Sequence, residues 1–278
     1  MKKKKALRIL AVAFAAALLS GGIYLLTKDD IKQKIRDNDL KPYMPTPVVL
    51  ASLDDISDSD NTTVVTENIS EGSVQMTESA VAASPELSSE IRQQLIESTI
   101  SLNKAYPNAI GWLYIPNTAI SYPIMQADDN SYYLEHTYDG SSLKAGSIFL
   151  DFRCENRFMN PVNIIYGHNM NNGSMLAGVL NYADNSYFDS HKYGWLATTE
   201  TVYRVDFFSC AKADWNDDLY KGSTPTSEWI PHILNKSVIS REIAYTETDR
   251  FISLSTCSYE FQNARTILTG KLNETKEV

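Results

Sequence analysis

The 278-residue sequence has few cysteines and no excess of basic residues. Its three cysteines, Cys154, Cys210 and Cys257, lie far apart and lack the paired spacing of a zinc site. So few cysteines also argue against a disulfide framework in a chain of this size. The formal net charge is −9, but one acidic segment carries it and the remainder is near neutral, so we expect no surface for nucleic acid. We therefore expect no metal, no cofactor and no nucleic-acid partner.

The acidic excess is confined to one segment. Residues 51–90 contain nine Asp and Glu residues and neither Lys nor Arg. The segment is rich in Ser and Thr and shows no clear periodicity. The alternative, a small separate domain, is disfavoured because there are too few large apolar residues to fill a core. We predict that residues 29–83 form an acidic, disordered tether.

The N-terminus carries a long apolar run. Four lysines and an arginine within residues 2–8 precede Ile9–Leu26, whose ~18 residues would extend roughly 27 Å as a helix, enough to cross the hydrocarbon core. A cleaved signal peptide is the alternative, but no small-residue cleavage site precedes the charged stretch. We predict that residues 1–28 form a cytoplasmic basic tip and a single-pass signal anchor. Residues 84–278 would then be an extracellular domain.

The predicted domain begins with a helix. Ser84-Pro85-Glu86 has the features of a helix start, with Ser84 as N-cap and Pro85 at the first helical position. An apolar face with helical spacing continues to Leu102, and Tyr106-Pro107 ends it. Shorter helices are expected at Gly173–Asn181 and Ser227–Leu234.

Short alternating segments dominate the remainder and predict strands. We expect eight: Gly111–Pro116, Ile120–Met125, Gly146–Asp151, Asn163–Tyr166, Thr201–Cys210, Val238–Tyr245, Phe251–Thr256 and Arg265–Leu272. Eight strands with few helices predict a mainly β fold, a closed or nearly closed β-barrel.

Two of these strands bring Cys257 and Arg265 to one rim of the sheet. Cys257 ends one strand and Arg265 begins the next, so antiparallel pairing places both at the same edge. A fixed cation beside a thiol favours the thiolate and can later stabilise an oxyanion. The best candidate for a proton carrier is His168, which also follows an apolar strand.

These motifs resemble those of sortases, the membrane-anchored cysteine transpeptidases of Gram-positive cell surfaces. The motifs are Tyr-Gly-His-Asn-Met at 166–170, Leu-Ser-Thr-Cys at 254–257, and Arg265 on the next strand. The runs at 111–113 and 146–151, with the long connection before the Cys257 strand, are similar to class B sortases. The resemblance covers about Ser84 to Leu272.

The resemblance implies a sortase-type eight-stranded barrel with an N-terminal helical extension. Cys257 would attack the carbonyl of a threonine in a C-terminal sorting motif and form a thioester. His168 would transfer protons and Arg265 would stabilise the oxyanion, while Ser255 and Tyr259 would contact the substrate. The partners would be surface proteins with a sorting signal and an amine of a peptidoglycan precursor or a pilin.

Two other functions stay open from the sequence. A surface cysteine endopeptidase would use the same residues with water as the acceptor. A non-catalytic surface β-domain would bind a partner while Cys257 stays inert. Cys154, Cys210 and the histidines other than His168 are interpreted as structural or solvated.

Overall fold

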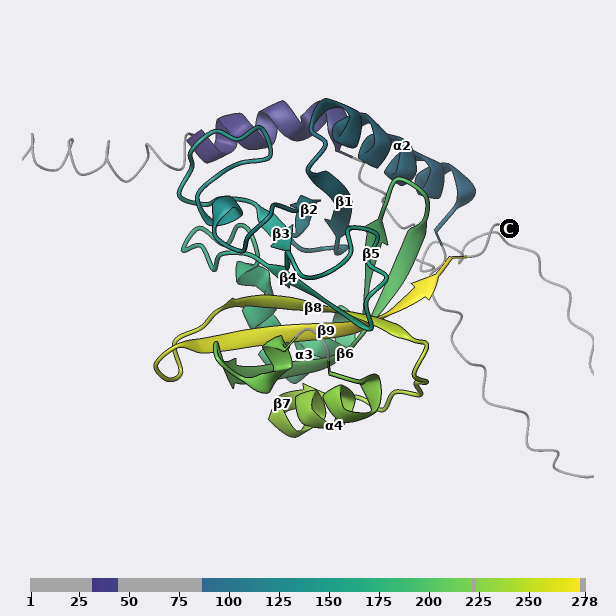
Figure 1. Cartoon of the computed structure of the whole chain (residues 1–278), viewed down its shortest axis with the longest axis vertical. Helices are drawn as coiled ribbons and strands as arrows, with labels where there is room; N and C mark the ends of the chain where they lie inside the picture. Colours follow the sequence, from purple (N-terminus) through teal and green to yellow (C-terminus); the bar gives the residue numbers. More distant parts are fainter. Residues whose placement is uncertain (1–31, 45–86, 222–223, 276–278) are drawn as a thin grey trace, which may run out of the picture.

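The computed structural model describes residues 32–44, 87–221 and 224–275 (Figure 1). The apolar run Ile9–Leu26, predicted to span the membrane, lies outside these residues, as does most of the acidic segment. Within the described ranges, no helix is both long enough and apolar enough to cross a lipid bilayer.

A mixed β-barrel forms the centre of the described part of the chain (Figure 1). Its nine strands follow the order β5-β1-β2-β3-β4-β8-β9-β6-β7, and a further pairing of β5 with β6 closes all except β7 into a ring. The pairs β2–β3 and β4–β8 are parallel, and the others are antiparallel. The predicted fold class, a closed eight-stranded barrel, is confirmed. The strands are β1 (Ala109–Tyr114), β2 (Ser121–Met125), β3 (Ile148–Leu150), β4 (Val162–Tyr166), β5 (Tyr193–Ala197), β6 (Val202–Asp214), β7 (Ser237–Ser240), β8 (Arg250–Cys257) and β9 (Ala264–Glu274).

The barrel strand β5 is absent from the predicted set. Its sequence contains Gly194, and glycine is depleted in strands. A Cβ atom at this position would lie 3.1 Å from the ring of Phe207 and 3.3 Å from the side chain of Ile115. Close packing of these side chains therefore favours glycine at position 194. Because glycine has a low strand propensity, the sequence of β5 does not look like a strand.

The prediction of a barrel strand at Val238–Tyr245 is wrong. Only the short β7 is a strand, and it pairs with β6 outside the ring. Beyond it, the guanidinium of Arg241 donates hydrogen bonds to the carbonyls of Phe207 and Phe188 at 2.7 and 2.9 Å. The backbone nitrogen of Arg241 also donates to the carbonyl of Phe208 at 2.8 Å. Together these bonds hold the chain after β7 against neighbouring elements.

The helix α2 (Ser89–Ala105) begins later than predicted. Ser88 is its N-cap and accepts a hydrogen bond from the backbone nitrogen of Ile91 at 3.4 Å. The start predicted at Ser84 is therefore wrong, because a second serine closer to the apolar face takes the capping role. The predicted end at Tyr106 is confirmed.

One of the two shorter predicted helices is confirmed. The helix expected at Ser227–Leu234 is α4 (Thr226–Lys236). The segment Gly173–Asn181 instead leads into a 3-10 helix, because Met175 has a left-handed backbone angle φ of 60°. The remaining helical elements of the described residues are a helix over 32–40, η1 (Lys41–Tyr43), η3 (Tyr132–Leu134), η4 (Ala177–Ala183), α3 (Asn185–Ser190) and η5 (Asp218–Tyr220).

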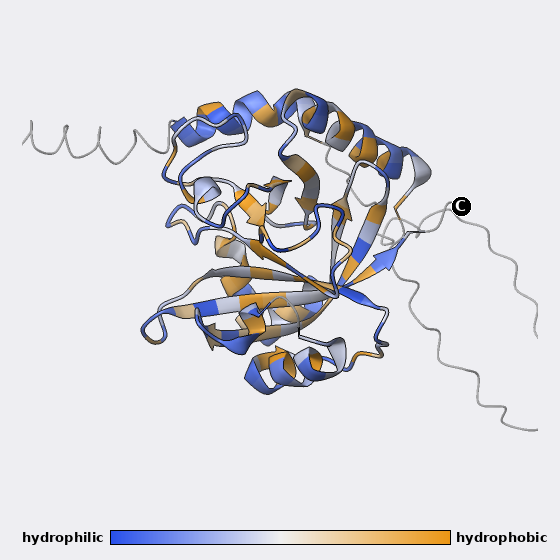
Figure 2. Cartoon of the chain, in the orientation of Figure 1, coloured by the Kyte–Doolittle hydropathy of each residue, from blue (hydrophilic) through white to orange (hydrophobic). Residues whose placement is uncertain are grey.

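Hydrophobic residues form the barrel interior and two layers outside it. Leu254 belongs to the interior cluster. On one side of the barrel, α2 packs Leu95 in a cluster with Trp112, and on another, α4 packs Trp229 in a cluster with Phe251. Both helices alternate hydrophilic and hydrophobic segments along their length in Figure 2, as expected for helices that cover a sheet with one face.

Residues 32–44 pack on the barrel, although they lie in the segment 29–83 that is predicted to be a tether. Arg36 is buried and donates a hydrogen bond to the carbonyl of Gly146 at 3.0 Å. Leu40 is buried in the same cluster as α2, and Figure 1 shows this purple helix beside α2. The chain thus contacts the barrel both before and after the acidic residues, which connect two elements of one domain.

Replacing Arg36 with alanine is expected to lower the free energy of unfolding by roughly 1–3 kcal/mol, because the buried carbonyl of Gly146 loses its donor. Urea denaturation followed by tryptophan fluorescence measures the change. Lys34→Ala is the matched control, since Lys34 lies on the exposed face of the same helix. Equal stability of the two variants would show that residues 32–44 do not contribute to the folded domain.

Candidate active site

The carboxyl ends of β4 and β8 lie next to each other, and each leads to a predicted catalytic residue. The two strands are parallel, with Tyr166 opposite Ser255. Just beyond β4, the carbonyl of Gly167 accepts a hydrogen bond from the hydroxyl of Thr256 at 2.7 Å. The amide of Asn169 donates to the carbonyl of Cys257 at 3.0 Å. The backbone of residue 168 is therefore held beside that of Cys257.

Arg265 reaches the same edge through the hairpin between β8 and β9. Cys257 and Arg265 are direct partners across this antiparallel pair. Side chains of directly opposed residues lie on the same face of a sheet. Arg265 is half-buried, and one of its terminal nitrogens donates to the carbonyl of Ala264 at 3.0 Å. The structure thus brings the backbones of all three predicted residues to one mouth of the barrel.

The imidazole of His168 is oriented by a backbone carbonyl. Its Nε2 lies 2.8 Å from the carbonyl oxygen of Leu134, the last residue of η3. A carbonyl oxygen only accepts hydrogen bonds, so Nε2 carries a proton and donates it to this bond. In the neutral ring, Nδ1 is then the basic nitrogen, available for proton exchange.

Cys257 differs from the other two cysteines in its exposure. Cys154 and Cys210 are buried, whereas Cys257 is partly exposed, and all three are free thiols. Burial raises the pKa of the Cys154 thiol, and it raises the pKa of Cys210 to about 12. Both therefore stay protonated and unreactive near neutral pH, and Cys257 is the more accessible thiol.

The two predicted substrate-contact residues lie in different surroundings. Ser255 is buried, and its hydroxyl is 2.8 Å from the phenol oxygen of Tyr220. Tyr259 lies in the loop between β8 and β9 and is 79% exposed. Both flank Cys257 in sequence, and their contact with a substrate stays a prediction.

Tyr220 is a residue of this site that the sequence pattern does not indicate. It ends η5, in the long connection between β6 and α4, where no periodicity fixes its position. Burial raises its pKa to about 12, while the hydrogen bond with Ser255 acts in the opposite direction. The phenol therefore stays neutral and is a stable hydrogen-bond partner for the residue two positions before Cys257.

Sequence comparison decides the family. No family model matches the sequence. Sortase B of Listeria monocytogenes is 34% identical to the chain over 197 residues, which are 69% of this chain and 78% of the relative. The chain belongs to the class B sortases. Membership of this family identifies the protein, in general terms, as a cysteine transpeptidase.

Solved class B sortases share the barrel of this sortase. A class B sortase of Streptococcus pyogenes involved in pilus biogenesis is 30% identical, with a TM-score of 0.59, over 63% of this chain and 97% of its own. A complex of Staphylococcus aureus sortase B with its substrate is 26% identical, with a TM-score of 0.61, over 66% and 87%. The predicted class B resemblance is confirmed.

Proposed function

We propose that this sortase is a membrane-anchored transpeptidase that cleaves a C-terminal sorting motif after threonine and joins the threonine to a cell-wall or pilin amine. The proposal is supported most strongly by the backbone register, which puts Cys257 opposite Arg265 and the β4 end that leads to His168 beside the end of β8. A nucleophile, a proton carrier and a cation are the groups that acyl transfer requires.

In the first step, the Cys257 sulfur attacks the threonine carbonyl, and the C=O electrons move to its oxygen. Arg265 stabilises this oxyanion. As the oxyanion collapses, the peptide C–N bond breaks, and His168 donates a proton to the departing amine. The product of this half-reaction is a thioester between the threonine carbonyl and the Cys257 sulfur.

In the second step, the acceptor amine attacks the thioester and loses a proton to His168. The C–S bond breaks, the sulfur leaves as thiolate, and an amide forms. The hydrogen bond from Nε2 to the carbonyl of Leu134 favours Nδ1 as the nitrogen that exchanges the proton. The same ring thus acts as acid in one half-reaction and as base in the other.

The chemistry of related proteins supports a peptide donor and an amine acceptor. Staphylococcus aureus sortase B has been solved with its substrate, and a sortase B has been solved with triglycine. For this chain, the corresponding donors are surface proteins with a C-terminal sorting signal. Ser255 and Tyr259 contact the donor peptide beside Cys257.

Membrane attachment is part of the proposal and rests on the apolar run Ile9–Leu26. Residues 32–44 already pack on the barrel. Only residues 27–31 then separate the span from the domain, a reach of at most about 20 Å. The catalytic domain is therefore held close to the outer face of the membrane, where exported substrates emerge.

Competition between amine and water tests the proposed reaction. The full-length protein is incubated with a library of sorting-type peptides, with and without triglycine, and the products are separated by mass. We expect the triglycine adduct to exceed the hydrolysis product, and Cys257→Ala to form neither. Hydrolysis alone would identify a cysteine endopeptidase, and a lack of any cleavage would favour a non-catalytic binding domain.

A further inference from the structure

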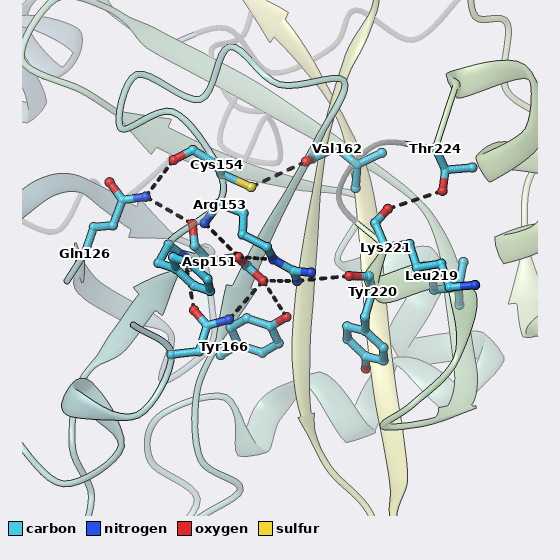
Figure 3. Close-up of polar contacts among 12 residues, drawn as sticks. Gln126, Asp151, Arg153, Cys154, Val162, Tyr166, Leu219, Tyr220, Lys221 and Thr224 are labelled. Carbon is cyan, nitrogen blue, oxygen red and sulfur yellow. Dashed lines mark hydrogen bonds and ion pairs between the residues drawn. The ribbon is translucent and has the colours of Figure 1, made fainter. Parts of the chain in front are cut away.

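A buried carboxylate lies behind the active site with a full set of donors. Asp151, which follows β3 directly, is 1% exposed. Its Oδ1 accepts from the backbone nitrogen and Nε of Arg153 at 2.9 and 2.8 Å. Its Oδ2 accepts from the phenol of Tyr166 at 2.9 Å and the amide of Asn130 at 3.1 Å. Figure 3 shows Asp151 between the side chains of Arg153 and Tyr166.

Asp151 and Arg153 both stay charged near neutral pH, so their ion pair persists there. Burial acts to raise the pKa of Asp151, but the hydrogen bonds from Arg153 outweigh it and hold that pKa below its ordinary value. The hydrogen bond to Asp151 raises the pKa of the Arg153 guanidinium. Burial also raises the pKa of Tyr166, so its phenol remains a donor.

Arg153 extends from this carboxylate to the connection that carries Tyr220. Its Nη2 donates to the backbone carbonyl of Tyr220 at 2.9 Å (Figure 3). The Tyr220 ring stacks on Tyr166, with centroids 6.2 Å apart and an interplanar angle of 23°. Its phenol then reaches Ser255 at 2.8 Å. A continuous path of contacts therefore leads from Asp151 to the strand that ends at Cys257.

The path contacts both catalytic strands at equivalent places. Tyr166 and Ser255 are register partners on β4 and β8. Tyr166 precedes His168 by two residues, and Ser255 precedes Cys257 by two. The backbone ladder already fixes the two strands relative to each other, whereas Arg153 adds a bond to η5, which belongs to neither strand.

We propose that Arg153, oriented by Asp151, is a positioning residue that fixes η5 beside the barrel mouth and thereby holds Tyr220 on Ser255. This inference rests on the proposed function, because Ser255 is where the donor peptide binds. Arg153 is suited to the task because its planar guanidinium can bond the carboxylate with two nitrogens and still reach a carbonyl. A lysine has one nitrogen and cannot span both partners.

The test compares Arg153→Lys with Arg157→Lys in the full-length protein. Arg157 lies in the same connection between β3 and β4 and makes an exposed ion pair with Glu200, so the same chemical change is made away from η5. We expect Arg153→Lys to raise the KM of the donor peptide about tenfold or more, as loss of a charge-assisted hydrogen bond predicts. The kcat and the alkylation rate of Cys257 by iodoacetamide should change by less than about threefold.

Arg157→Lys should match the wild type in all three measurements. A KM for Arg153→Lys within about twofold of the wild type would overturn the proposal, as would an equal rise in both variants. A lower kcat for Arg153→Lys with an unchanged KM and slower alkylation of Cys257 would also overturn the proposal, because Arg153 would then act on the Cys257 thiol.

Two further measurements keep the test decisive. Tyr220→Phe keeps the Asp151–Arg153 pair and removes only the phenol that reaches Ser255, so it should raise KM in the same way even if Arg153→Lys fails to fold. Hydrogen exchange across residues 216–221 should be faster in Arg153→Lys than in Arg157→Lys. Hydrogen exchange does not depend on turnover. Equal exchange in the two variants would show that Arg153 does not position η5. A wild type that cleaves no peptide would instead show that the proposed function is wrong.

Discussion

Cys257→Ala is expected to lose at least about 10³-fold in kcat/KM for donor peptide cleavage while the fold is retained. The loss follows because no other thiol can form the thioester. Cys154 and Cys210 are buried, and burial raises the pKa of each thiol. Alanine at position 257 removes only a partly exposed sulfur, so the barrel keeps its core.

Cys154→Ala is the matched control for this substitution. It removes a thiol from the same chain but from the connection between β3 and β4, where Sγ contacts the carbonyl of Val162 at 3.7 Å. Its kcat/KM should stay within about threefold of the wild type. If Cys257→Ala retained the activity of Cys154→Ala, the nucleophile would have been misassigned.

His168→Ala is expected to lower kcat/KM by about 10²–10⁴-fold, the usual contribution of a general acid–base group. The wild-type activity should fall on both sides of a pH optimum, because the proposed reaction needs a proton donor in one half-reaction and a proton acceptor in the other. The variant should lose the pH dependence that the imidazole contributes. Peptide cleavage measured across the pH range gives both results.

His191→Ala serves as the control for the histidine. His191 follows α3 and stacks on the ring of Tyr187, and its Nδ1 lies 3.0 Å from the carbonyl oxygen of the same residue. The variant should keep the wild-type pH profile. A His168→Ala profile that matched it, with kcat/KM within about tenfold of the wild type, would remove His168 from the mechanism.

The Cys257 and Arg265 pair could be predicted from the sequence because it depends on local pattern. Alternating residues define β8 and β9, and a short polar turn fixes them as a hairpin. Antiparallel pairing then places Arg265 opposite Cys257. Strand alternation and turn length are sufficient for this part of the site.

The position of His168 could not be derived in the same way. Its strand β4 is parallel to β8 and far from it in sequence. Parallel partners have no connecting turn, so no local pattern indicates which strands will be neighbours. Its place after an apolar strand makes His168 a candidate, and the resemblance of the motif at 166–170 to sortases adds the expectation that it lies beside Cys257.

The contacts behind the site are hidden from the sequence for a similar reason. Asp151 and Arg153 lie in the connection between β3 and β4, whereas Tyr220 lies in η5, and each has an ordinary polar or aromatic sequence context. The bond from Arg153 to the carbonyl of Tyr220 forms only after this connection and η5 have been brought together. The strand β5 is missing from the prediction because it contains Gly194. Glycine is rare in strands, but here it leaves room for the ring of Phe207.

The most direct test of the central claim is the intact mass of the protein during turnover. The wild type is mixed with a cleavable sorting-type peptide, quenched in acid to preserve a thioester, and analysed by mass spectrometry. We predict an added mass equal to the peptide up to its threonine, located on Cys257 by fragmentation and released by triglycine. Peptide cleavage with no adduct on Cys257, or with the adduct on another residue, would contradict the account.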